Sequence, residues 1–258
     1  DPVLRKNITE FYGLLRGFSI DNVITDEQAS YIKIWRNKFE PYSYREEITK
    51  IIDSIDMALF DGIITVDEVT DIQGIVKNYL DMVNTAPSTL ATQILNGILE
   101  GIVKDGEVSE IECKKLREWL YDNIYLSGHY PFDKIIHAVE DILADGVVTK
   151  EESNQLSTLI AELLNPVETL TNIVNDVEGK HICLSGNFEY GTKQDVEKYI
   201  TERRGLIDNS VKKSTDILVV GNCECLAYSQ GTFGTKVIKA MEYKEKGSNI
   251  SIIKEKDL

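Results

Sequence analysis

The sequence predicts a multidomain protein of the α plus α/β class. We expect an all-α bundle of four helical hairpins, followed by a β-α-β-β-α-β domain with a parallel four-stranded sheet. In the first 165 residues, one turn motif recurs four times at intervals of about 40 residues, which indicates repeated helical hairpins. After Gly179 the helical period gives way to short apolar runs typical of buried strands. The expected domains are 1–165 and 178–258, joined by a linker helix at 166–177.

The repeated turn reads Asp, then Gly or Asn, then two residues of which the second is apolar, then Thr or Ser. Its four copies begin at Asp21, Asp61, Asp105 and Asp145. Gly or Asn tolerates a positive φ and so ends one helix. The Thr or Ser, with Glu or Gln three residues later, forms a capping box for the next helix. Apolar residues at helical spacing flank the turns, and a proline lies between successive hairpins, so we expect eight helices.

The same turn is similar to the second half of an EF-hand loop, which makes calcium binding an alternative. In that register, the first two ligand positions of the second copy would be Met57 and Leu59. Calcium requires several oxygen ligands, so we favour capped helix turns and expect no metal or other cofactor. Asp145, with Asp141 and Glu152, is the copy in which carboxylates come closest to such a set.

The formal net charge of −15 over 258 residues is unevenly distributed. Residues 1–177 hold 15 basic and 31 acidic side chains, whereas residues 178–258 hold 13 basic and 12 acidic side chains. An acidic surface repels a polyphosphate backbone, so we expect any nucleic-acid contact to come from the C-terminal domain. Solubility of the helices is the simpler explanation of the acidity itself.

The four cysteines and the lack of an N-terminal apolar run predict a soluble protein in a reducing compartment. We expect a cytoplasmic protein of bacterial or phage type, with nucleoid association left open. No apolar stretch reaches membrane-spanning length, so no membrane partner is expected. Because the chain begins Asp1-Pro2, upstream sequence can be missing.

The elements of the C-terminal domain follow from its periodicity. Strands are predicted at 181–184, 206–207, 217–220 and 250–253, with helices at 192–203 and 235–246. Strands that alternate with helices favour a parallel sheet. Upstream, Pro166 and the apolar stripe that follows it predict the linker helix.

Short motifs occur in a fixed order over about 80 residues of this domain. They are Gly179-Lys180, Ser185-Gly186, Gly205, Lys213, Thr215, Leu218-Val219-Val220-Gly221, Gly234-Thr235-Lys236 and Glu255. This order resembles the BRCT domain, and it is most similar to the single BRCT domains of NAD-dependent DNA ligases and of the large subunit of replication factor C. The resemblance implies binding of phosphorylated peptides or phosphate-bearing DNA ends, usually in DNA repair or replication.

The resemblance implies a phosphate-binding role for three residues. Ser185 matches the hydroxyl donor, Gly186 the glycine with a backbone N–H donor, and Lys236 the lysine at the start of the second helix. That lysine adds to the positive end of the helix dipole. The alternative is that Ser185-Gly186 is a plain turn and that Thr235 is a helix cap beside an incidental lysine.

Three further basic residues are candidates for DNA contact. Lys193 matches a basic residue that contacts DNA in replication-factor modules, and Arg203 and Arg204 extend a positive edge; for all three, a solvated surface role is the alternative. The loop at 222–233 is longer than in ligase-type modules and holds two cysteines, for which no completing zinc ligands are found nearby. The chain ends at Leu258, where the family's third helix would begin. We expect the linker helix, the helical domain or another chain to cover that face of the sheet.

The hairpin turns of residues 1–165 resemble those of TerB-like domains of tellurite-resistance and related bacterial stress proteins. This resemblance implies an interaction module and no enzymatic chemistry. The residues themselves point the same way: Lys104-Asp105-Gly106 lacks the spacing of the ligase Lys-x-Asp-Gly motif, and the three histidines form no acid–base pair.

We therefore expect no enzyme, and two functions stay open. In the first, the BRCT-like domain binds a 5′-phosphorylated DNA end or nick, and the acidic helical domain binds a protein partner. In the second, the chain is a scaffold that binds a phosphorylated or unmodified protein and no DNA. Homo-oligomerisation is left open in both.

Overall fold

The computed structural model describes residues 1–165, 176–221 and 234–258. The chain divides into two compact units, Asp1–Leu164 and Asn165–Leu258, and each is described by itself. Most of the expected linker helix and the loop at 222–233 lie outside the described residues, so both stay predictions. No helix in the described ranges is both long and apolar enough to cross a membrane.

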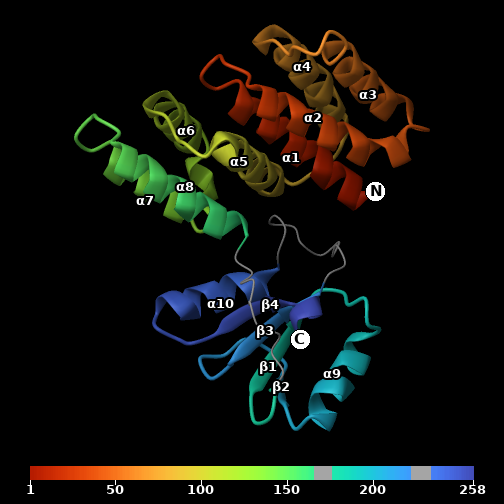
Figure 1. Cartoon of the computed structure of the whole chain (residues 1–258), viewed down its shortest axis with the longest axis vertical. Helices are drawn as coiled ribbons and strands as arrows, with labels where there is room; N and C mark the ends of the chain where they lie inside the picture. Colours follow the sequence, from red (N-terminus) through yellow and green to blue (C-terminus); the bar gives the residue numbers. More distant parts are fainter. Residues whose placement is uncertain (166–175, 222–233) are drawn as a thin grey trace. The chain divides into compact units, whose positions relative to one another are not determined.

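The first unit is all-α, as predicted (Figure 1). Its described residues form eight α-helices, which pair as hairpins around the four repeated turns. The helices are α1 (Pro2–Phe18), α2 (Asp26–Phe39), α3 (Glu46–Ala58), α4 (Val66–Met82), α5 (Pro87–Ile102), α6 (Glu110–Asp122), α7 (Phe132–Ile142) and α8 (Lys150–Leu164). Short 3-10 turns lie at Glu40–Tyr42, Val103–Asp105 and Ile124–Leu126.

The repeated turns have the capped geometry that their sequence predicts. Thr25, Thr65 and Ser109 each form a complete capping box with the residue three positions later, and Thr149 exchanges the same two hydrogen bonds with Glu152. The aspartate that opens each turn accepts a hydrogen bond from the backbone N–H two residues on, at 3.0–3.1 Å. The second residue has a positive φ, between 64° and 85°, in every copy.

A seam of glycines brings the backbones of α1 and α5 into direct contact. A Cβ atom on Gly13 would lie 2.1 Å from the carbonyl oxygen of Ile94, and one on Gly97 would lie 2.0 Å from that of Glu10. Both distances are far below van der Waals contact, so only glycine fits at these positions. The seam fixes how closely the first helix of the unit packs on the fifth.

The contacts of the seam are related by a shift of 84 residues. Gly97 follows Gly13 by 84 positions, and Ile94 follows Glu10 by 84 positions, so each contact has a mirror partner. Gly17 and Gly101 repeat the pattern, each at 2.7 Å from the other helix's carbonyl oxygen. The same shift relates the first two turns to the last two. The helical unit is therefore two related halves, α1–α4 and α5–α8, that meet as two identical surfaces would.

The second unit is the predicted β-α-β-β-α-β domain. Its elements are β1 (His181–Ser185), α9 (Lys193–Glu202), β2 (Leu206–Asp208), β3 (Ile217–Val220), α10 (Thr235–Glu245) and β4 (Ser251–Lys254). All described strand pairs are parallel, and the strand order is β2-β1-β3-β4. The helices α9 and α10 lie on opposite sides of the sheet (Figure 1).

The chain ends in a 3-10 turn, Glu255–Asp257, where a third helix would begin. The sheet beneath is nevertheless not bare, since Ile217, Val219 and Ile253 are at most 5% exposed. These side chains belong to one apolar cluster with Phe188, and Leu258 packs against it. The described residues therefore bury the sheet face that the missing helix would cover.

Candidate phosphate-recognition site

The carboxyl end of β1 forms a fixed corner. Ser185, the last residue of β1, is paired with Val220 of β3, and its carbonyl accepts a hydrogen bond from the N–H of Gly221 at 2.9 Å. A Cβ atom on Gly221 would lie 1.8 Å from the carbonyl oxygen of Asn187. The chain therefore leaves β1 pressed against the end of β3. It turns there through Gly186, whose φ of +90° suits glycine.

The side chain of Lys236 reaches this corner from α10. Its Nζ donates a hydrogen bond of 2.8 Å to the carbonyl oxygen of Leu184, the residue before Ser185. An ammonium group has three donors, so this bond leaves others for an anion. The structure thus brings Lys236 beside Ser185-Gly186, although the phosphate-binding role of the three residues stays a prediction.

The amino end of α10 adds a positive field to the corner. Gly234 is the N-cap of α10, and no side chain caps it. Thr235 is the first helical residue, so the alternative in which it serves as the helix cap is wrong. In a parallel sheet with crossover helices, the helix amino ends lie at the carboxyl ends of the strands. The uncapped amides and the helix dipole favour an anion there.

The hydroxyl of Ser185 is available for a ligand. Ser185 is 7% exposed, and its side chain has no hydrogen-bond partner among the described residues. Two positions earlier on the same face of β1 lies Cys183, which is fully buried. Burial raises the pKa of the Cys183 thiol, while the positive charges of Lys236 and Lys193 act to lower it. Both cations therefore act at the carboxyl end of β1.

Lys193 begins α9, and its Nζ is 3.7 Å from the carboxylate of Glu197. Arg203 and Arg204 follow the other end of the same helix, which spans ten residues and is about 15 Å long. Arg203 lies 3.6 Å over the ring of Tyr199, and Arg204 pairs with Glu178 at 2.9 Å. The two arginines are thus engaged locally and are not brought to the corner, whereas Lys193 lies on its side of the domain.

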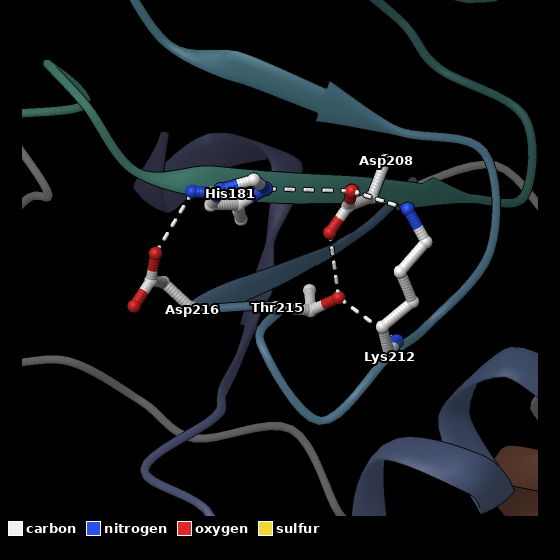
Figure 2. A network of polar contacts seen from close by, with 5 residues as sticks. All are labelled: His181, Asp208, Lys212, Thr215 and Asp216. Atoms are coloured by element: carbon white, nitrogen blue, oxygen red, sulfur yellow. Dashed lines mark hydrogen bonds and ion pairs between the residues drawn. The ribbon is translucent and has the colours of Figure 1, made fainter.

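A second polar cluster, which the sequence did not predict, fastens the β2–β3 loop to β1 (Figure 2). Asp208 is 4% exposed, and its carboxylate accepts hydrogen bonds from the Thr215 hydroxyl at 2.8 Å and from Lys212 Nζ at 3.1 Å. His181 Nδ1 lies 3.4 Å from the same carboxylate, and the backbone N–H of His181 donates to Asp216 at 2.8 Å. The cluster holds the starts of β1 and β3 in register.

The charge on Asp208 is stabilised by these partners. Burial acts to raise the pKa of Asp208, but the hydrogen bonds from Thr215, Lys212 and His181 outweigh it and hold the pKa below its ordinary value. The carboxylate is therefore ionised and fully used as an acceptor. Its role is structural: it positions the strand that carries Cys183 and Ser185.

Comparison with known proteins matches the second unit. The family model described as the BRCA1 C Terminus (BRCT) domain matches residues 173–255. A DNA ligase of Thermoanaerobacter sp. is 35% identical over 81 residues, which are 30% of this chain and 12% of the ligase. DNA ligases of Levilactobacillus brevis and Lactiplantibacillus plantarum are 30% and 29% identical over 94 and 97 residues, about a third of this chain and 14% of each ligase.

The chain thus spans only 12–14% of the length of these ligases. No solved structure shows a significant match. The matches do not reach the helical unit, whose resemblance to TerB-like domains stays a prediction. The motif order, the parallel sheet of order β2-β1-β3-β4 and the family match agree over the same segment. Residues 173–255 of this chain are therefore a BRCT domain.

Proposed function

We propose that this protein is a non-catalytic interaction protein of DNA repair or replication, and that its BRCT domain binds a 5′-phosphorylated DNA end or nick. The observation that carries the proposal is the position of Lys236, whose Nζ is 2.8 Å from the Leu184 carbonyl at the corner formed by Ser185 and Gly186. A hydroxyl, a backbone N–H and an ammonium can then donate to one phosphate group. The similarity to BRCT segments of DNA ligases supports a DNA ligand.

The test is fluorescence anisotropy of the full chain on a duplex with a recessed 5′-phosphate, compared with the same duplex after dephosphorylation. We expect the phosphorylated duplex to bind about tenfold more tightly, since charge-assisted hydrogen bonds contribute about 1.5–3 kcal/mol. Lys236→Ala should remove this preference. Lys198→Ala is the matched control, because Lys198 lies on the exposed side of α9 and pairs with Glu202. Equal binding of both duplexes would contradict the proposal.

A second function is favoured by the charge of the rest of the chain. Residues 1–177 hold 31 acidic and 15 basic side chains, and an excess of negative charge weakens binding to DNA. In this alternative, the same corner binds a phosphorylated protein. A phosphoserine peptide and its unphosphorylated form, assayed with the same two variants, distinguish the cases: a phosphate preference confined to the peptide supports the scaffold function.

A further inference from the structure

The turn between α3 and α4 exposes three large apolar side chains. Met57, Phe60 and Ile63 are 77%, 91% and 68% exposed; together they are called the α3–α4 tip. The N–H of Phe60 donates to the carbonyl of Met57 at 3.2 Å, so the backbone holds the first two within a single turn of chain. Exposed apolar side chains that gather in this way mark interaction sites.

Folding does not require an apolar tip. The related turn, 84 residues later, carries Asp141 and Ala144 in place of Met57 and Phe60. Its backbone forms the same bond, from the N–H of Ala144 to the carbonyl of Asp141 at 3.3 Å. The glycines of the two turns share a φ of +82°. Because one backbone geometry is built with either set of side chains, the apolar set serves something other than the turn.

The surroundings of the tip are strongly acidic. Residues 51–76 contain six acidic side chains and no basic one. Asp53 and Asp56 lie four positions before Met57 and Phe60, on the same side of α3. Asp56 also pairs with Arg36 of α2 at 2.8 Å. This net negative charge disfavours nucleic acid and anionic lipid, and it favours a cationic partner.

We propose that the α3–α4 tip docks a basic segment of a partner protein. Apolar side chains of that segment pack against Met57, Phe60 and Ile63, while its Lys and Arg side chains face the carboxylates around the tip. The contact is independent of phosphate recognition, because the tip belongs to the helical unit and the phosphate corner to the BRCT domain. It gives the acidic helical unit a defined binding surface.

The test uses the full chain and a fluorescein-labelled 14-residue peptide with Lys and Leu at helical spacing. A peptide with Glu in place of every Lys is the charge control. The tip variant is Met57→Asp with Phe60→Ala, the side chains of the related turn. The matched control is Ile34→Glu, which replaces a half-exposed apolar side chain of α2 by the residue found 84 positions later and also adds one negative charge.

We expect the Lys-Leu peptide to bind the wild type, and the tip variant to bind it about tenfold more weakly, as expected for the loss of apolar anchors. Ile34→Glu should change the affinity less than about twofold, and the Glu-Leu peptide should not bind. Equal affinity in the tip variant, or an equal loss in Ile34→Glu, overturns the proposal. A wild-type dimer that sedimentation velocity shows to dissociate in the tip variant also overturns it, because the occupant is then a second copy. All variants should keep the DNA-end behaviour of the wild type.

Discussion

The two halves of the helical unit share a backbone frame but carry different side chains at related positions. The frame residues recur: Gly13 and Gly97 in the seam, Trp35 and Trp119 in the core. Around the frame, the halves diverge. The phenol of Tyr31 donates to Glu100, and the Lys104 ammonium lies 3.5 Å over its ring, whereas the related position holds Lys115. Positions that set the backbone geometry are thus kept, and positions that only cover it are free to differ.

The seam is where the halves should respond alike and most strongly. Gly13→Ala and Gly97→Ala each place a Cβ about 2 Å from a backbone oxygen. We expect each to lower the free energy of unfolding by about 3 kcal/mol or more, since backbone must move to admit the methyl group. Chemical denaturation followed by circular dichroism measures the change. A clear inequality between the two variants would break the equivalence of the halves.

Gly74→Ala is the control for the seam variants. Gly74 lies within α4, and nothing lies within 4 Å of a Cβ built on it. Alanine has the higher helix propensity, so this variant should gain about 0.5–1 kcal/mol. A loss of stability in Gly74→Ala would show that alanine is disfavoured for reasons other than contact.

A smaller effect should distinguish the halves by pH. Glu112 and Gln28 are related capping residues, and each is 5% exposed. Burial raises the pKa of Glu112 to about 7, against the hydrogen bonds from Ser109 and with the charges of Asp105 and Asp21. Because the folded-state pKa lies above the ordinary 4.5, this carboxyl favours folding below about pH 4.5, and that contribution is lost as the pH rises to about 7.

Glu112→Gln should therefore stabilise the chain by about 2 kcal/mol above pH 7 and flatten the dependence of unfolding free energy on pH between about 4.5 and 7. The amide can still cap, since Gln28 already accepts a hydrogen bond from the N–H of Thr25 at 3.0 Å. The reverse change, Gln28→Glu, should introduce the same pH dependence into the first half. Denaturation at a series of pH values measures both, and parallel curves for wild type and Glu112→Gln would contradict the assignment.

The smallest expected effect belongs to the caps. Thr25→Ala, Thr65→Ala, Ser109→Ala and Thr149→Ala each remove one side-chain bond to a helix amide. Each should lower the free energy of unfolding by about 1 kcal/mol. Thr70→Ala, an exposed position inside α4, should stay within about 0.5 kcal/mol of wild type. Unequal losses within the pairs 25/109 and 65/149 would show which cap the neighbouring packing supports.

Local signals account for what the sequence predicts well. The Asp-Gly turns and their Thr or Ser caps are complete within eight residues, so all eight helices could be placed. The seam could not be predicted in the same way, because Gly13 and Gly97 acquire their meaning only when α1 meets α5. The 40-residue turn period also hides the 84-residue duplication, since every turn looks like its neighbour.

The candidate site divides along the same line. Ser185, Gly186 and Lys236 could be named from the motif order, and the structure brings them to one corner. The Asp208 cluster could not, because a carboxylate after a short strand reads as surface until Thr215 and Lys212 close over it. Arg203 and Arg204 looked like an extension of the corner in the linear sequence, but α9 carries them to its far end.

The α1–α5 seam has a consequence for stoichiometry. Two separate, identical subunits that meet through such a contact must present every surface twice, and any ligand of one is a ligand of both. Here both sides of the contact are encoded in a single polypeptide, so a substitution can enter one half alone. The molecule keeps the packing of a symmetric pair yet has one Phe60 and one Glu112, and it can therefore hold one partner per chain, in one orientation.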